Sequence, residues 1–155
     1  MKIKSAVALF ACSAMMLCAQ NATDLFTPAK LKQLTQKLAA ESKQKGAGFA
    51  GETLTRYGNH LTMLAHREQS GSAELHAKVA DFLYVIDGDA TIITGGKMLN
   101  GKTTEANEIR GTSIQGGRSQ KMGVGDIIHI QPNVPHQFLL APGHTLTYFV
   151  IKVDE

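Results

Sequence analysis

The spacing of apolar residues changes from helical to strand-like near residue 53. Before that point, apolar side chains recur at helical spacing among lysines and glutamines, at Leu31, Leu34 and Leu38. Thr27 suits the cap of this helix and Pro28 its first turn, because proline lacks the amide hydrogen that the first turn leaves unpaired. The pattern therefore predicts one amphipathic helix that ends near Gly46.

Beyond residue 53 the pattern predicts short β-strands separated by glycine-rich turns. The predicted strands cover residues 53–58, 60–68, 78–86, 89–96, 111–117, 126–130, 136–141 and 145–153. The dipeptide Asp87-Gly88 lies between two apolar runs and predicts a tight hairpin. The segment from Lys97 to Gly111 is polar and irregular, and we expect it to be a long loop.

No helical period separates these strands, which argues against crossover helices and a parallel sheet. The pattern predicts an all-β fold, an antiparallel sandwich or barrel. The predicted domain organisation is a signal peptide at 1–20, an N-terminal helical arm at 21–52 and a barrel at 53–153.

The first residues have the pattern of an export signal. A basic start, MKIK, precedes the apolar run SAVALFACSAMMLCA, which is shorter than the roughly 20 residues of a membrane span. We expect cleavage after Ala19 or Ala22 and a periplasmic or secreted protein. Cleavage would remove both cysteines, Cys12 and Cys18, so the exported domain would have no disulfide.

Composition narrows the range of partners. The formal charge of the whole chain is +3, and two of its lysines belong to the predicted signal. The remaining charge gives no argument for binding nucleic acid or for stable membrane insertion. No nucleotide-binding glycine loop and no nucleophilic-serine motif is present. We therefore expect a small-molecule ligand and, from the apolar face of the helix and the strand edges, a homodimer.

Candidate chemistry concentrates just before the strand at residues 78–86. Glu74, His76 and Lys78 alternate and are expected to share one strand face, whereas Asp81 has the opposite parity unless the chain bends. Buried charges need a charged partner or a metal. Imidazole and carboxylate together suit zinc, iron, manganese or nickel.

Two stretches resemble the two motifs of the cupin superfamily, small double-stranded β-helix barrels of the jelly-roll type. The first motif is usually His-x-His, three or four residues, Glu, six residues, Gly. Here Asp81 and Gly88 reproduce the last interval, His76 falls on the second histidine and Glu74 on the first. A shorter register would instead place His76 on the first histidine and Lys78 on the second.

The second motif usually begins Gly-Asp, passes a proline and ends Pro-His. It is matched by Gly125, Asp126, Pro132, Pro135 and His136. The resemblance implies that His136 corresponds to the last metal ligand of the family.

The resemblance thus implies a divalent metal (Zn, Mn, Fe or Ni) bound by His76, His136, Asp81 and Glu74. Alternatively, Glu74 serves as a general base, or Lys78 fills the place of the metal and pairs with the carboxylates. Small cupins include dioxygenases, isomerases, lyases and binding modules. The leading interpretation is a metal-dependent enzyme acting on a small oxygenated organic molecule. The alternatives are a non-catalytic cupin that captures a sugar or metabolite, and a stress or assembly factor that acts through its surface.

Overall fold

The computed structural model describes residues 23–44, 46 and 48–155, so the predicted signal peptide lies outside the described residues. The predicted helix is present as α1, Pro28–Gln44. Thr27 caps it, since its Oγ1 accepts a hydrogen bond from the Lys30 amide at 3.3 Å. No helix in the described part of the chain is both long and apolar enough to cross a membrane.

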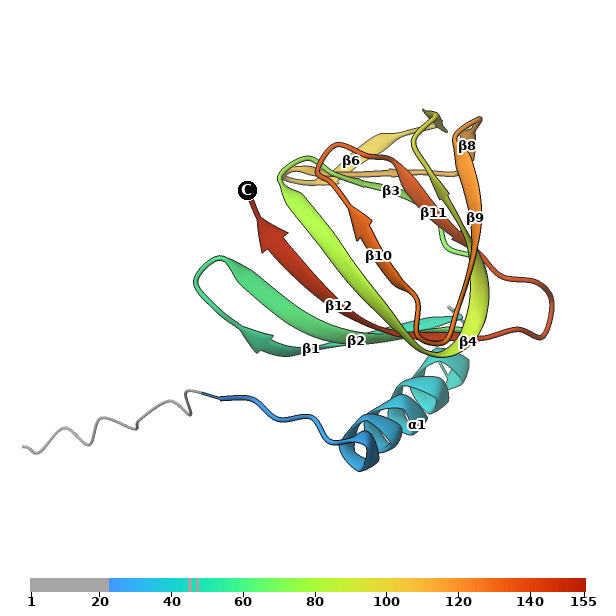
Figure 1. Cartoon of the computed structure of the whole chain (residues 1–155). Coiled ribbons are helices and arrows are strands. Elements are labelled where there is room, and N and C mark those ends of the chain that lie inside the picture. The colour runs from blue at the N-terminus through green and yellow to red at the C-terminus, as the bar shows by residue number, and fades with distance from the viewer. Residues whose placement is uncertain (1–22, 45, 47) are drawn as a thin grey trace, which may run out of the picture.

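The rest of the chain is built from antiparallel strands (Figure 1). The strands are β1 (Phe49–Arg56), β2 (His60–Arg67), β3 (Ala73–His76), β4 (Val79–Thr94), β5 (Lys97–Leu99), β6 (Lys102–Glu105), β7 (Glu108–Gly111), β8 (Ser113–Gln115), β9 (Arg118–Gly123), β10 (Ile127–Ile130), β11 (His136–Leu139) and β12 (Leu146–Asp154). The sheet begins at Phe49 rather than Thr53, so the helical arm is shorter than the sequence predicted.

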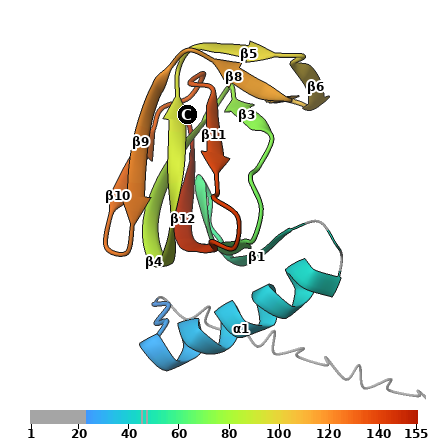
Figure 2. The ribbon, with the colours of Figure 1, turned by 90° about the vertical axis from the view of Figure 1, so that its right-hand side faces the viewer.

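The main sheet has the order β1-β2-β12-β4-β11-β3-β7-β6, and β9 and β10 also pair with β4. Because β4 pairs with β12 and β10 along one part and with β11 and β9 along another, the sheet curls around an interior. Figure 2 shows α1 below the strands. The architecture confirms the predicted all-β fold, a curled antiparallel sheet consistent with a double-stranded β-helix.

The predicted hairpin at Asp87-Gly88 is wrong. The strand β4 continues through both residues to Thr94, and the register with β12 shifts between Thr147 and Tyr148. Gly88 has a φ of 77°, and a Cβ atom there would lie 1.9 Å from the Thr145 carbonyl oxygen. Glycine at this position therefore lets one long strand bend and change partners, rather than turning the chain back.

The predicted loop between Lys97 and Gly111 is also wrong. It contains β5, β6 and β7, of which β7 pairs with β3 and so extends the sheet next to the candidate site. The residues of β6 are all exposed and polar, which explains why no alternating pattern identified this strand.

Two apolar clusters stabilise the fold. The larger fills the interior and includes Leu83, Val85, Phe138, Leu146 and Val150. The smaller joins α1 to the outer side of the sheet, where Leu34 and Leu38 pack against Leu64. The leucines of the predicted apolar stripe thus contact their own sheet.

Candidate metal and ligand site

Four predicted site residues meet inside the curled sheet. Glu74 and His76 lie on β3, Asp81 lies on β4, and His136 begins β11, which pairs with both of those strands. All four side chains are buried, with relative exposures of 9%, 4%, 5% and 2% in that order. The sequence motifs thus correctly brought together segments that are 60 residues apart.

Asp81 reaches this group because the chain bends between β3 and β4. The first strand ends at His76 and the next begins at Val79, so strand parity is interrupted and does not carry through to Lys78. Lys78 is exposed and does not line the cavity, so the expectation that it enters the barrel is wrong.

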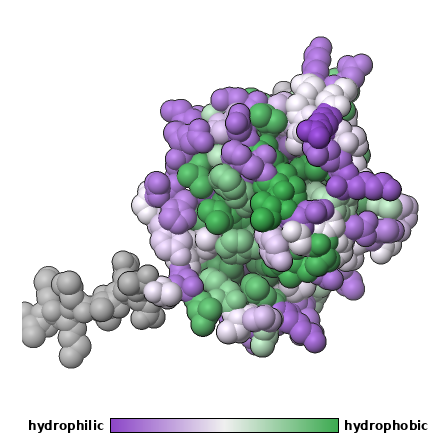
Figure 3. Space-filling model, viewed as in Figure 1, coloured by the Kyte–Doolittle hydropathy of each residue, from purple (hydrophilic) through white to green (hydrophobic). Residues whose placement is uncertain are grey.

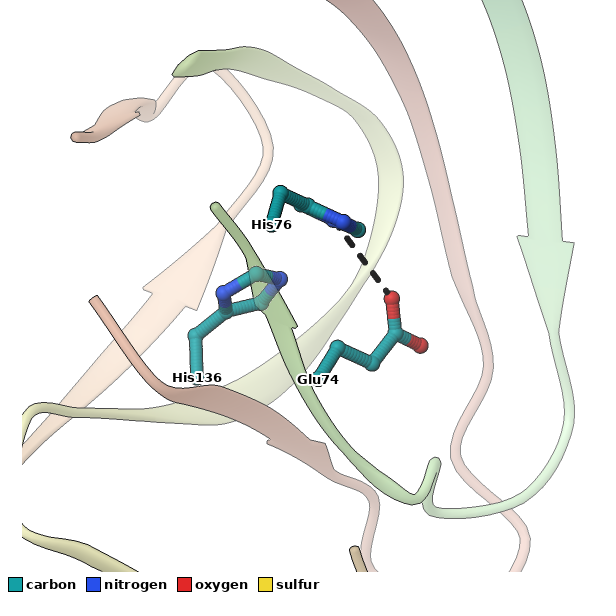
Figure 4. A group of neighbouring side chains, drawn as sticks. All are labelled: Glu74, His76 and His136. Carbon is teal, nitrogen blue, oxygen red and sulfur yellow. Dashed lines mark ion pairs between the residues drawn. The ribbon is translucent and has the colours of Figure 1, made fainter. Parts of the chain in front are cut away.

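Both histidines are held by their outer ring nitrogens. His76 Nδ1 lies 2.6 and 2.7 Å from the carboxylate oxygens of Glu108, and His136 Nδ1 lies 3.1 Å from the Val134 carbonyl oxygen. Such acceptors fix the neutral tautomer with hydrogen on Nδ1 and leave Nε2 free to accept or ligate. Glu74, His76 and His136 each place a potential ligand atom within 4.8 Å of the others (Figure 4).

Glu74 is held between two arginines. Its Oε1 lies 2.6 Å from Arg110 Nη1 and 3.3 Å from Arg67 Nη2, and its Oε2 lies 3.9 Å from His76 Nε2. Burial acts to raise the pKa of Glu74, but the charges of Arg110 and Arg67 outweigh burial and hold that pKa below its usual value. Glu74 is therefore a stable anion and a weak base.

A lysine does reach the site, but from the last strand. Lys152 of β12 is the cross-strand partner of Asp81, and its Nζ lies 2.7 and 2.9 Å from the two carboxylate oxygens. The same ammonium lies 3.0 Å from His76 Nε2. The alternation along β12 predicts that Lys152 faces the interior, because the buried Tyr148 and Val150 have the same parity. Only the pairing of β12 with β4 identifies Asp81 as its partner.

The two histidines differ in the direction of their pKa shifts. Burial lowers the pKa of His136, and the Val134 hydrogen bond and nearby carboxylates do not offset this effect. Burial also acts to lower the pKa of His76, but the hydrogen bond and charge of Asp81, together with Glu108, raise it overall. Neutral His76 accepts from Lys152, whereas protonated His76 donates to Asp81 Oδ2, 3.3 Å away.

The four residues open onto a cavity of about 450 Å³. Its wall includes the apolar residues Phe49, Met63 and Phe138 and the cations Arg67, Arg110 and Lys152. The sequence analysis missed these three cations and Glu108. Arg67 lies outside both motifs, and Glu108 and Arg110 lie in the segment that was predicted to be a loop.

Other histidines lie away from this cavity. His66 is buried, with its Nδ1 2.9 Å from Thr147 Oγ1, and His129 stacks on Phe82 with ring centroids 4.1 Å apart. Neither lines the cavity that His76 and His136 enter.

Several solved structures share the fold of this chain. No protein-family model matches the chain, and no curated protein matches it significantly. A conserved protein with a double-stranded β-helix domain from Klebsiella pneumoniae has a TM-score of 0.51 and 13% identity, over 68% of this chain and 76% of that one.

Two enzymes give similar scores. The polyketide cyclase RemF from Streptomyces resistomycificus has a TM-score of 0.50 and 18% identity, over 70% of this chain and 66% of that one. The DMSP lyase DddQ from Ruegeria pomeroyi has a TM-score of 0.50 and 12% identity, over 69% and 47%. The chain thus spans just under two thirds of the cyclase and about half of the lyase. With the strand order, these likenesses show that the chain has a double-stranded β-helix fold.

Proposed function

We propose that the chain is an exported single-domain cupin that holds a divalent metal and acts on a small oxygenated organic molecule. The observation that carries this proposal is the anchoring of both Nδ1 atoms, which leaves two Nε2 atoms directed toward Glu74 and Asp81. Two imidazoles and one or two carboxylates suit zinc, iron, manganese or nickel. When bound, the ion would supply Lewis-acid or oxygen-binding chemistry of the dioxygenase, isomerase or lyase kind.

The chain's own residues define the remaining roles. Because the pKa values of Glu74 and Asp81 are both lowered, these carboxylates offer negative charge rather than basicity. His136 stays neutral at pH 7, since burial lowers its pKa. The general-base role expected for Glu74 is therefore less well supported than a role as ligand or as the anionic partner of the arginines. The apolar wall would exclude water from the bound molecule.

Elemental analysis and calorimetry test the metal. The purified protein, titrated with zinc, manganese, iron or nickel, should bind one ion per chain, and His136→Ala should lower that affinity at least about 100-fold. Losing one of three or four ligands in a folded site is sufficient for such a loss. Unchanged metal affinity in His136→Ala, at unchanged circular dichroism, would contradict the assigned ligand set.

A second candidate is a metal-free binding cupin, and the contacts of Lys152 favour it. Its ammonium already donates to Asp81 and His76, two of the groups that a metal would need. An ammonium placed in this way neutralises a buried carboxylate, as an ion would. In this reading the cavity captures a metabolite without an ion.

The two candidates separate in a matched pair of variants. Lys152→Met removes the internal cation, whereas Lys78→Met removes the same charge from an exposed position nearby. If Lys152 replaces the metal, wild-type protein and Lys78→Met will bind no ion and Lys152→Met will bind one. If the metal reading is correct, all three proteins will bind, and Lys152→Met most tightly because competition is removed.

Export remains a proposal from residues 1–22, which lie outside the described part of the chain. We expect a mature N-terminus between Ala19 and Thr23, and N-terminal sequencing of exported protein would identify it. An intact Met1 in a cytoplasmic fraction would contradict export.

A homodimer is also proposed, with a different surface from the helix stripe that the sequence suggested. Exposed apolar side chains gather over β4 and β10, where Phe82, Tyr84 and Ile127 are 41%, 47% and 75% exposed (Figure 3). A two-fold axis through this surface would cover both copies at once. Light scattering should report a dimer, and Ile127→Asp should convert it to a monomer; a wild-type monomer at high micromolar concentration would contradict the proposal.

A further inference from the structure

The guanidinium of Arg67, in the cavity wall, is held by two aromatic rings as well as by its ion pair with Glu74. Arg67 is only 6% exposed, and its Cζ lies 4.5 Å from the ring centroid of Phe49 and 5.1 Å from that of Phe138. Aromatic faces on a guanidinium restrict its orientation and reduce the entropy lost when a ligand binds. Arg67 is therefore a preorganised cation facing the cavity.

Two donor atoms at this place, Arg67 Nη1 and the Tyr148 hydroxyl, have no acceptor among the described residues. Arg67 donates through Nε to the Tyr148 hydroxyl at 3.2 Å and through Nη2 to Glu74 at 3.3 Å, while its Nη1 has no partner among the described residues. Because the Tyr148 oxygen accepts from Arg67, its own hydrogen needs a different acceptor, and the described side chains and backbone supply none. Burial raises the pKa of Tyr148, so that hydrogen is retained.

The carboxylates near Arg67 are each shared with, or paired to, another cation. A single oxygen, Glu74 Oε1, is shared by Arg67 and Arg110. Asp81 is already paired with Lys152. The third carboxylate, Glu108, contacts His76 Nδ1, lies 4.0 Å from Arg110 Nη2 and does not line this cavity. A guanidinium that shares its carboxylate oxygen with a second arginine and keeps Nη1 unused is suited to an oxyanion.

The surrounding chain leaves room for this arrangement. A Cβ atom on Gly71 would lie 2.7 Å from Arg67 Nη1, so glycine at this position lets the backbone approach the guanidinium. The apolar wall beyond it, with Met63 and Phe138, would contact a hydrocarbon body. The cavity thus offers one charged anchor and an apolar remainder.

We propose that Arg67 Nη1 and the Tyr148 hydroxyl bind the carboxylate of a small organic acid, with its apolar part against Met63 and Phe138. This inference rests on the proposed small-molecule function, because it names the substrate class of the same cavity. It does not depend on the metal.

The test compares carboxylates with their neutral amides. Butyrate, hexanoate and benzoate, each beside its amide, are titrated by calorimetry into protein freed of metal by a chelator that is then dialysed away. We expect each carboxylate to bind at least about tenfold more tightly than its amide, since charged hydrogen bonds give such discrimination. Arg67→Gln should remove the preference, and Tyr148→Phe should reduce it.

The control is Arg118→Gln, which removes the same charge from an exposed position on β9 and should leave carboxylate binding unchanged. Equal affinity for acids and amides, absence of binding by every acid, or unchanged affinity in both Arg67→Gln and Tyr148→Phe would overturn the assignment. Tighter binding of inorganic phosphate than of any carboxylate would overturn it too. Metal titration of the same samples tests the proposed metal site separately, so the two failures are distinguishable.

Discussion

The interior of the curled sheet has an apolar region and a polar region built on the same two strands. Along β4 and β12, Val85 and Leu146 belong to the apolar cluster, while Asp81 and Lys152 form an ion pair in the candidate site. Alternation places side chains of both kinds inside, and only the residue type changes along the strand. The apolar region therefore stabilises the barrel. This stability offsets the cost of burying the charged groups of the polar region.

The polar region is organised by mutual neutralisation. Glu74 contacts two arginines, Asp81 contacts Lys152, and His76 contacts Glu108. Replacing one partner of a buried ion pair costs more than the pair itself contributes, because a charge remains without compensation. We therefore expect substitutions to destabilise the apolar region through lost burial and the polar region through an uncompensated charge.

The largest effect is expected in the apolar region. Leu146 is fully buried in the interior cluster, so Leu146→Ala should lower the free energy of unfolding by about 2–5 kcal/mol through lost burial and a new cavity. Urea denaturation followed by circular dichroism measures it. The control is Val124→Ala, at a residue that is 67% exposed. Equal destabilisation by both variants would contradict the assignment of stability to this cluster.

A somewhat smaller effect is expected from the polar region. Glu74→Gln leaves Arg67 and Arg110 without their shared carboxylate and should cost about 3 kcal/mol of unfolding free energy. Glu52→Gln, which removes a carboxylate from an exposed pair with Lys37, is the matched control and should have little effect. If Glu74→Gln were as stable as the wild type, the arginines would not depend on that carboxylate.

The sequence predicted the fold better than the site. Alternation and turn residues identify strands wherever one face is buried, as in β12, but not in β6, whose residues are all exposed. The hairpin predicted at Asp87-Gly88 failed because a glycine with positive φ serves a bend and a turn equally well. Local sequence alone does not distinguish these two uses.

At the site, the sequence predicted the residues within the two motifs but not the charged side chains that pair with them. Glu74, His76, Asp81 and His136 converge as the resemblance implied, because the two motifs fix spacing along paired strands. The lysine was misplaced because parity was counted through a bend at 77–78, whereas Lys152 meets Asp81 only through the pairing of β12 with β4. Such a partner depends on long-range register, which local spacing does not reveal.

The smallest expected effect distinguishes the two histidines within the polar region. The pKa of His136 is lowered in the folded protein, so as pH falls below about 6.5 the unfolded chain gains a proton that the folded chain does not, and stability falls. The pKa of His76 is raised, so its contribution is complete below about pH 6.5 and is lost as pH rises through the folded value.

Metal-free protein should therefore be most stable between these two losses, with slopes of at most about 1.4 kcal/mol per pH unit for each histidine. Urea midpoints between pH 5 and 8 measure the profile. His136→Gln should flatten the acidic side alone, and His76→Gln the alkaline side alone. Glu74 and Asp81 do not contribute to these slopes. Their pKa values are lowered from 4.5 and 3.8, so their stabilisation is lost only as pH falls below those values, outside the measured range. If both variants flattened the same side, the two imidazoles would share one environment, and the opposite effects assigned to Asp81 and to burial would be wrong.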